Sequence, residues 1–216
     1  VRVVGDVTVP DGGRLEILAG TKVLIADQDA SKAGRDKGSV EIVVRGQLLV
    51  QGSTERPVLM TLESASADAE KDSTEAIELR LQWHGITLLP SGDAAKNRDH
   101  VRGLHLEHAK AGIRIPDGDP LIEDCVFRHC TLGIDIGVVW IQGKFVTTAG
   151  CGPAGPEIRR CRFTSGYTGV CACASAVPVV ELCVFHKLRN GVSSHRPDLV
   201  YYLAEPGPTV SHCIFH

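Results

Sequence analysis

Hydrophobic and polar positions in the second half of the chain recur in a fixed order. A proline is followed two residues later by Ile or Val, three residues after that by Cys, and two residues later by Phe. Four segments have this order, residues 120–127, 156–163, 178–185 and 208–215. Six residues after the first three Phe residues comes a Gly followed by a β-branched residue. Such repeats indicate supersecondary units that stack on one another.

The spacing of the repeat predicts a coil of three short strands. Successive prolines of the motif are 36, 22 and 30 residues apart, so the motif is constant while the intervals vary. Gly and Pro interrupt the apolar runs, which keeps the strands short and leaves the length changes to loops. The step of three residues from Ile122 to Cys125 predicts a tight corner near Asp124. The expected inward set of one coil is Ile122, Cys125, Phe127, Ile134 and Ile136.

Stacked parallel coils place like residues over like, with neighbouring strands about 4.8 Å apart. The predicted inward columns are Cys125, Cys161, Cys183 and Cys213, and Phe127, Phe163, Phe185 and Phe215. We expect these cysteines to be buried thiols that pack as small hydrophobic groups. The alternative is an antiparallel sandwich. It predicts turn signals about every 8–12 residues and no residue-specific period.

The N-terminal half carries a second pattern, which resembles a known family. Its segments are Gly5-Asp6-Val7-Thr8-Val9-Pro10, Leu15-Glu16-Ile17, Gly46-Gln47-Leu48-Leu49-Val50 and Trp83-His84-Gly85-Ile86. Together with the later repeats they resemble bacterial right-handed parallel β-helix repeat proteins of the pectate-lyase-like superfamily, over nearly the whole chain. The resemblance implies an all-β fold, a right-handed parallel β-helix (solenoid) of about six coils with an N-terminal capping region. The corner positions depart from the Asn of many relatives, since they hold Asp124, Arg160, Leu182 and His212.

We expect one continuous domain. Residues 1–62 are predicted to form the N-terminal cap and first coils, residues 63–76 a surface loop, and residues 77–216 the regular coils. The chain begins at Val1 without a signal peptide and stops partway through a coil. We therefore expect an excised or processed piece, truncated at the C-terminus, whose last coil is capped by a partner or self-associates.

Composition excludes several classes of protein. Hydrophobic residues make up 43% and charged residues 23% of the chain, which is ordinary for a folded domain. The net charge of −3 and sequence pI near 6.3 give no basic surface for nucleic acid or an anionic membrane. No apolar run approaches the ~18 residues of a membrane span, so no membrane insertion is expected.

Arg114 and Asp135 are the candidate catalytic residues. In enzymes of the resembled superfamily the substrate binds along an outer strand face, which points to an outer groove beside the Gly-Ile strands. Pectate-lyase chemistry needs clustered carboxylates for calcium and an Arg or Lys base, and calcium takes six to eight oxygen ligands. The paired aspartates of galacturonan hydrolases are missing, although glycosidases generally need two carboxylates. The alternative is that Arg114 and Asp135 form a plain surface ion pair.

Cys171 and Cys173 are candidate binding residues on the same outer face. Cys171 falls in the column of Arg114 and Asp135, and Cys173 in the column two residues further on, with His195 one coil beyond it. Thiolates and imidazole are ligands for soft metals, although a Cys-x-Cys pair alone is a weak signal, and no metal site is assigned. The alternative is that the loop of residues 137–155 folds over this face, bringing Trp140 onto it and pairing Cys151 with one of the two thiols. Trp140 is therefore included among the candidate binding residues.

Asp117 and Asp119 flank Gly118 and are the candidate calcium ligands, against the alternative of a tight turn. No other cofactor is expected. His84, next to Trp83, is interpreted as a turn histidine with satisfied hydrogen bonds.

Three functions fit these observations. The first is a non-catalytic module, a scaffold or a binding surface for glycan or protein. The second is a polysaccharide lyase or hydrolase that uses the outer groove. The third is a self-assembly module that stacks through its open coil end. The resemblance places all three outside the cytoplasm, as a secreted, periplasmic or cell-surface protein.

Overall fold

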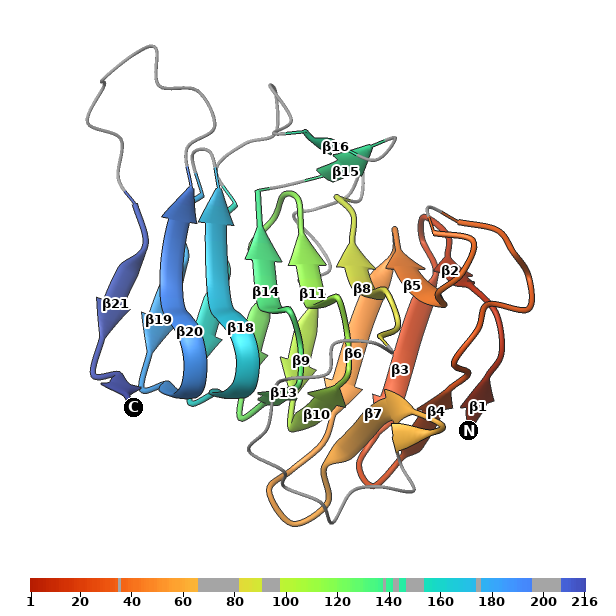
Figure 1. Ribbon diagram of the computed structural model, residues 1–216, viewed down its shortest axis with the longest axis horizontal. Helices are drawn as coiled ribbons and strands as arrows, with labels where there is room; N and C mark the ends of the chain where they lie inside the picture. Colours follow the sequence, from red (N-terminus) through yellow and green to blue (C-terminus); the bar gives the residue numbers. More distant parts are fainter. Residues whose placement is uncertain are drawn as a thin grey trace.

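The computed structural model of this chain is built almost entirely from parallel β-strands. It describes residues 1–34, 36–65, 82–90, 98–137, 139–141, 144–146, 154–173, 176–195 and 207–216; the side chains of residues 139–141, 144–146 and 195 are outside the description. The strands lie side by side across the molecule in successive turns of chain, with the two termini near opposite ends of the stack (Figure 1). Within the described part, no helix has the length and apolar character needed to cross a bilayer.

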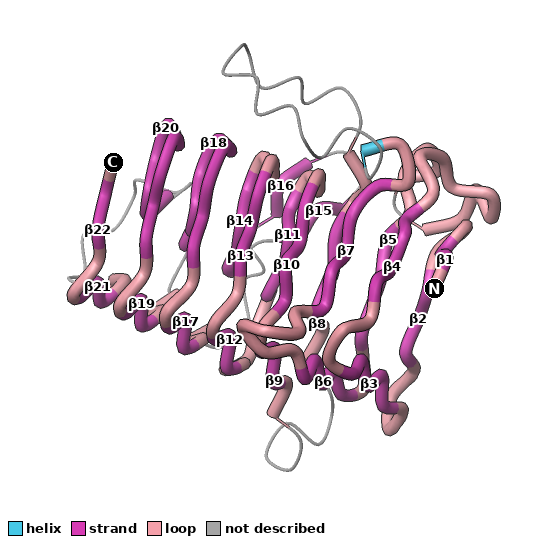
Figure 2. Tube along the Cα trace, turned by 90° about the horizontal axis from the view of Figure 1, so that it is seen from below, coloured by secondary structure: helices cyan, strands magenta, loops and turns pink. Residues whose placement is uncertain are grey.

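One parallel sheet of seven strands, here called face C, lines one side of the stack. Its order is β21-β19-β17-β12-β9-β6-β3, so each strand pairs with the corresponding strand of the next turn (Figure 2). The strands are β3 (Arg14–Leu18), β6 (Gln47–Gln51), β9 (His100–Arg102), β12 (Leu121–Glu123), β17 (Glu157–Arg159), β19 (Val179–Glu181) and β21 (Thr209–Ser211).

A sheet of thirteen strands covers the other two faces, here called A and B. Face A contains β1 (Arg2–Val3), β4 (Lys22–Ile25), β7 (Val58–Leu62), β10 (Leu104–Glu107), β13 (Val126–Arg128) and β22 (Ile214–Phe215). Face B contains β2 (Val7–Val9), β5 (Glu41–Val44), β8 (Gly85–Leu88), β11 (Ala111–Ile115) and β14 (Leu132–Ile136). The 12-residue strands β18 (Arg162–Cys173) and β20 (Val184–His195) run through both faces and join them into one sheet.

A short antiparallel hairpin follows β14. It pairs β15 (Val139–Ile141) with β16 (Lys144–Val146), and Figure 1 shows it outside the stack of turns, near the ends of β8, β11 and β14.

Residues in the left-handed region turn the chain between faces C and A. Asp124, Arg160, Leu182 and His212 have φ between 51° and 56°. The backbone N–H of Asp124 donates to the carbonyl of Arg159 in the next turn, and the equivalent bond recurs from Arg160 to Glu181. The tight corner predicted near Asp124 is therefore confirmed. A second corner, between faces A and B, repeats the same conformation at His108, His129, Ser165 and Lys187.

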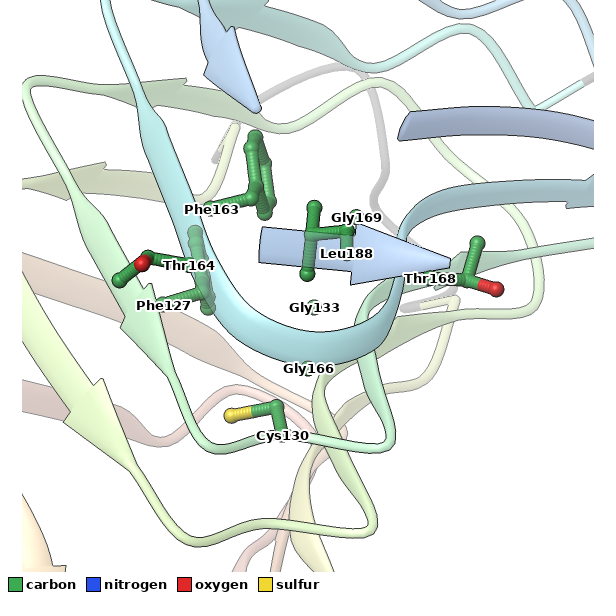
Figure 3. Close-up of a pocket in the computed structure, with 9 residues that line it drawn as sticks. All are labelled: Phe127, Cys130, Gly133, Phe163, Thr164, Gly166, Thr168, Gly169 and Leu188. Carbon is green, nitrogen blue, oxygen red and sulfur yellow. The ribbon is translucent and has the colours of Figure 1, made fainter. Parts of the chain in front are cut away.

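The interior contains the predicted columns. Phe127, Phe163, Phe185 and Phe215 stack with ring centroids 5.1, 5.0 and 4.9 Å apart and with interplanar angles of 6–7°. Figure 3 shows two of these rings beside the glycines that border them. Parallel register joins Ile122 to Ile158 and Phe127 to Phe163, so like residues lie over like. This excludes the antiparallel sandwich.

The cysteine column is buried as predicted, and its thiols have hydrogen-bond acceptors. Cys125, Cys161 and Cys183 are at most 1% exposed, Cys213 is half-buried, and all four are free thiols. Each thiol lies within 3.1–3.3 Å of the carbonyl two residues before it and within 3.5–3.7 Å of a carbonyl in the preceding turn. The cysteine column therefore fills the interior and also connects the corners of successive turns through thiol–carbonyl hydrogen bonds.

Candidate functional site

The outward row of face B collects the side chains that the sequence marked for chemistry. Parallel register places Thr87, Arg114, Asp135, Cys171 and Ser193 next to one another on β8, β11, β14, β18 and β20 (Figure 1). In β8, β11, β14 and β18 the residues on either side are buried and apolar, as Ile113 and Ile115 are beside Arg114. Alternation along a strand then turns Arg114 to the opposite side.

Arg114 and Asp135 form a buried ion pair, with 6% and 1% of their surfaces exposed. The Arg114 Nε donates to Asp135 Oδ2 over 3.1 Å. Burial raises the pKa of Asp135, and the Arg114 guanidinium opposes this by favouring the carboxylate. The alternative of a solvated surface pair is therefore wrong. Catalysis by Arg114 and Asp135 stays a prediction.

His84 and Glu41 extend the buried polar row toward the N-terminal strands. The His84 Nδ1 lies 3.3 Å from an Arg114 guanidinium nitrogen and 3.6 Å from Glu41 Oε2. His84 is 6% exposed and Glu41 is 3% exposed. From the sequence His84 was predicted only as a turn residue, and Glu41 was not recognised as its neighbour. The sequence did contain one signal, the charged residue Glu41 as the first residue of the otherwise apolar segment Glu41–Val44.

Cys171 and Cys173 face each other on one side of β18. Their sulfur atoms are 3.9 Å apart, well beyond the length of a disulfide bond. Cys171 is half-buried, whereas Cys173 is 8% exposed. The hydrogen bond with Cys173 lowers the pKa of Cys171 below its usual range, as does one with Ser193; burial and the Asp135 carboxylate act in the opposite direction. The structure therefore brings these two predicted residues together.

The remaining predicted binding residues are placed only by their backbone. β20 sets His195 in register with Cys173, and β15 sets Trp140 opposite Phe145 in the hairpin. The side chains of His195 and Trp140 lie outside the described part of the structure, as does Cys151.

Asp117 and Asp119 are both occupied by backbone hydrogen bonds. Asp117 Oδ1 accepts from the N–H of Gly118 over 2.7 Å, and Asp119 Oδ1 accepts from the N–H of Gly155 over 2.9 Å. Gly118 has a φ of 100°, a conformation that favours glycine and fits the tight turn. Among the described side chains, no three His, Cys, Asp or Glu residues group as metal ligands. Calcium at this turn stays a prediction.

Face C carries an exposed network of opposite charges. Arg160 pairs with Glu123 over 2.5 Å and with Asp124 over 2.7 Å, and Arg102 reaches the same Asp124 at 3.3 Å. Arg159 pairs with Glu181 on the next turn over 3.7 Å. Parallel register places Glu123, Arg159, Glu181 and Ser211 in one column on neighbouring strands of this face.

The geometry of face B favours structural ion pairing over turnover. A lyase base must reach a proton of the substrate at about 2.6–3.2 Å, whereas Arg114 is buried and contacts Asp135 and His84. Exposed charges on face C pair with each other. A comparison with family models, curated proteins and solved structures found no match to this chain.

Proposed function

We propose that this chain is a right-handed parallel β-helix of the pectate-lyase-like kind that serves outside the cytoplasm as a non-catalytic scaffold. One observation carries the proposal: the charged pair best suited to catalysis, Arg114 and Asp135, is buried and mutually neutralised. A buried ion pair of this kind fixes register between neighbouring strands and leaves no free base.

The surface charge of face C favours a protein as the binding partner of this scaffold. The guanidiniums of Arg102, Arg159 and Arg160 alternate with carboxylates along the stack. An acidic polysaccharide presents one sign of charge, so it would meet as many repulsive as attractive groups on this face. A protein surface can present both signs in complementary positions.

The test compares the wild-type chain with a double variant, Arg114→Met with Asp135→Leu. These apolar side chains resemble the originals in size, and replacing both partners of a buried pair is often close to neutral for stability. We expect no release of unsaturated or reducing sugar from uronic-acid polymers by either protein, with both chains folded. Turnover by the wild-type chain that the double variant lacks would overturn the scaffold and establish the lyase or hydrolase.

Binding is measured in the same samples by titration calorimetry with polygalacturonate. We expect no saturable heat. Saturable binding that is lost on changing Arg102 and Arg159 to Ala would replace the protein-binding scaffold by a glycan-binding one.

Self-assembly is a second candidate, supported by apolar exposure on the last strands. Ile214 is 52% exposed, Phe215 55% and Val210 41%, and all three lie on β21 and β22. Strand edges with such side chains pair readily with another chain. The candidate occupant is a second copy of this chain. Sedimentation should then show association that weakens with Ile214→Lys, and a monomer at every concentration would contradict it.

A further inference from the structure

The pair Cys171 and Cys173 differs from the other described cysteines in what its thiols face. The thiols of the inward column approach backbone carbonyls. Burial raises the pKa of Cys161 well above its usual value and raises the pKa of Cys130 to about 12, and the pKa of Cys183 is raised as well. For Cys183 the contact with Cys161 is the larger cause. These core thiols are kept neutral. Cys171 and Cys173 instead lie two residues apart on the outward side of β18, with their sulfur atoms 3.9 Å apart.

The separation of these two sulfurs matches a shared metal ion. Thiolate sulfurs bind Zn²⁺ at about 2.3 Å in tetrahedral geometry, which puts two sulfurs of one site about 3.8 Å apart. The observed separation between Cys171 Sγ and Cys173 Sγ is 3.9 Å. The two thiols therefore need almost no rearrangement to bind one ion.

A disulfide fits the same pair less well. Residues two apart in a strand have Cα atoms about 6.6–6.8 Å apart, at the upper edge of the range that a disulfide spans. The sulfurs would also have to approach each other to about 2.05 Å while β18 keeps its pairing with β14 and β20. Bridging would strain the middle of the sheet, whereas chelation would not.

The pair is accessible from the outer side of face B. Asp135 lies in register with Cys171 on β14, where its carboxylate is paired with Arg114. Cys171 is only half-buried, which leaves the pair open to solvent on one side.

We propose that Cys171 and Cys173 form a chelating thiolate pair that binds one soft divalent cation of the Zn²⁺ class on the outer side of face B. Binding releases the remaining thiol protons to solvent and changes no oxidation state. The site is independent of whether the chain is a scaffold or an enzyme.

The test titrates the reduced full chain with Cd²⁺, which reports thiolate coordination by an ultraviolet charge-transfer band, and then displaces it with Zn²⁺. We expect the band to saturate at one equivalent. Cys171→Ser and Cys173→Ser should each weaken binding by at least about 100-fold, because even the loss of an outer-shell partner costs 10–100-fold in metal affinity. Cys213→Ser is the matched control, a half-buried thiol of the inward column, and should leave the affinity unchanged.

Three results would overturn the proposal. One is a Cd²⁺ band that persists in the double variant Cys171→Ser with Cys173→Ser. Another is a band reduced equally by Cys213→Ser. The last is a mass loss of two hydrogens in the air-exposed wild-type chain that maps to a Cys171–Cys173 bridge. Circular dichroism of each variant separates lost binding from lost folding, and Cys171→Ser, at the half-exposed position, is the variant least prone to unfold.

Discussion

Each phenylalanine of the core stack rests against a glycine of the preceding turn. A Cβ at this glycine would meet the ring within 2.4–2.7 Å in every turn. The pairs are Gly112 with Phe127, Gly133 with Phe163, Gly169 with Phe185 and Gly191 with Phe215. The spacing of Phe and Gly in the sequence repeat thus has a packing cause, because the ring occupies the space that a side chain would fill.

Gly133→Ala should therefore destabilise the fold. Its Cβ would lie 2.5 Å from Phe163 Cδ1 and 2.5 Å from the carbonyl oxygen of Gly169. Overpacking of this kind costs about 1–3 kcal/mol, and urea unfolding would measure the loss. Gly38→Ala is the control, since the nearest contact of its Cβ is a side-chain oxygen of Asp36 at 3.4 Å. Equal effects of the two substitutions would contradict this explanation.

The corner residues give a prediction of opposite sign. Leu182 is 50% exposed and holds a φ of 56°, a conformation that costs an L-residue about 1–2 kcal/mol. Asn tolerates this region far better, so Leu182→Asn should raise the free energy of unfolding by up to about 1 kcal/mol. Leu182→Ala removes the same exposed apolar group without relieving the backbone, and should not stabilise. A gain with Ala as large as that with Asn would show that the corner strain is irrelevant.

At the scale of strands, the charges of face C connect neighbouring turns. Arg160 on the corner after β17 bonds both Glu123 and Asp124 on the preceding turn. The pKa of Asp124 lies below its usual value, chiefly because of the hydrogen bond from Arg160. The pKa of Glu123 is lowered as well, since bonds from His100 and Arg160 together outweigh burial. Carboxyls with lowered pKa stabilise the fold above their unfolded pKa, and this contribution is lost as the pH falls through the folded value.

The free energy of unfolding should fall as the pH drops from neutral to below 3.8–4.5, the ordinary pKa range of these two carboxyls. Arg160→Ala should make this fall smaller. Because the Arg160 side chain is 45% exposed, the effect at neutral pH should be about 1 kcal/mol or less. Unfolding curves at a series of pH values would measure it. Arg189→Ala is the charge-matched control, because Arg189 packs over the Tyr167 ring. If both variants have the same pH profile, the carboxyl contacts do not carry the effect.

The strands were predictable from the sequence because their evidence is local and repeated. Cys125 and Phe127 recur with the same spacing in four turns, and only one register superimposes them. The burial of Arg114 was not predictable in this way. Whether an outward side chain is solvated depends on what lies over its face, and the strand's own residues do not encode that. The contact of His84 with Glu41 was missed for a related reason, since β5 and β8 meet only through the stacking of turns.

At the scale of the whole molecule, each turn contacts mainly the turns on either side of it. The sheet orders join every strand to its equivalents in adjacent turns, so the stack is close to one-dimensional. In such folds stability is approximately a sum of units and their interfaces. A lesion in one turn should then weaken its neighbours and leave distant turns protected.

Hydrogen exchange of Phe185→Ala would measure how far such a lesion spreads. Phe185 is 2% exposed and stacks between Phe163 and Phe215, so its loss should cost about 3–5 kcal/mol locally. We expect amide protection to fall in β18, β20 and β22 and to change little in β4 and β7 near the other end of the stack. Phe215→Ala, at a ring that is already 55% exposed, is the control and should affect β20 and β22 only slightly. A uniform loss of protection from β4 to β22 would instead mean that the chain unfolds as one cooperative unit, and that turn-by-turn stacking does not describe its energetics.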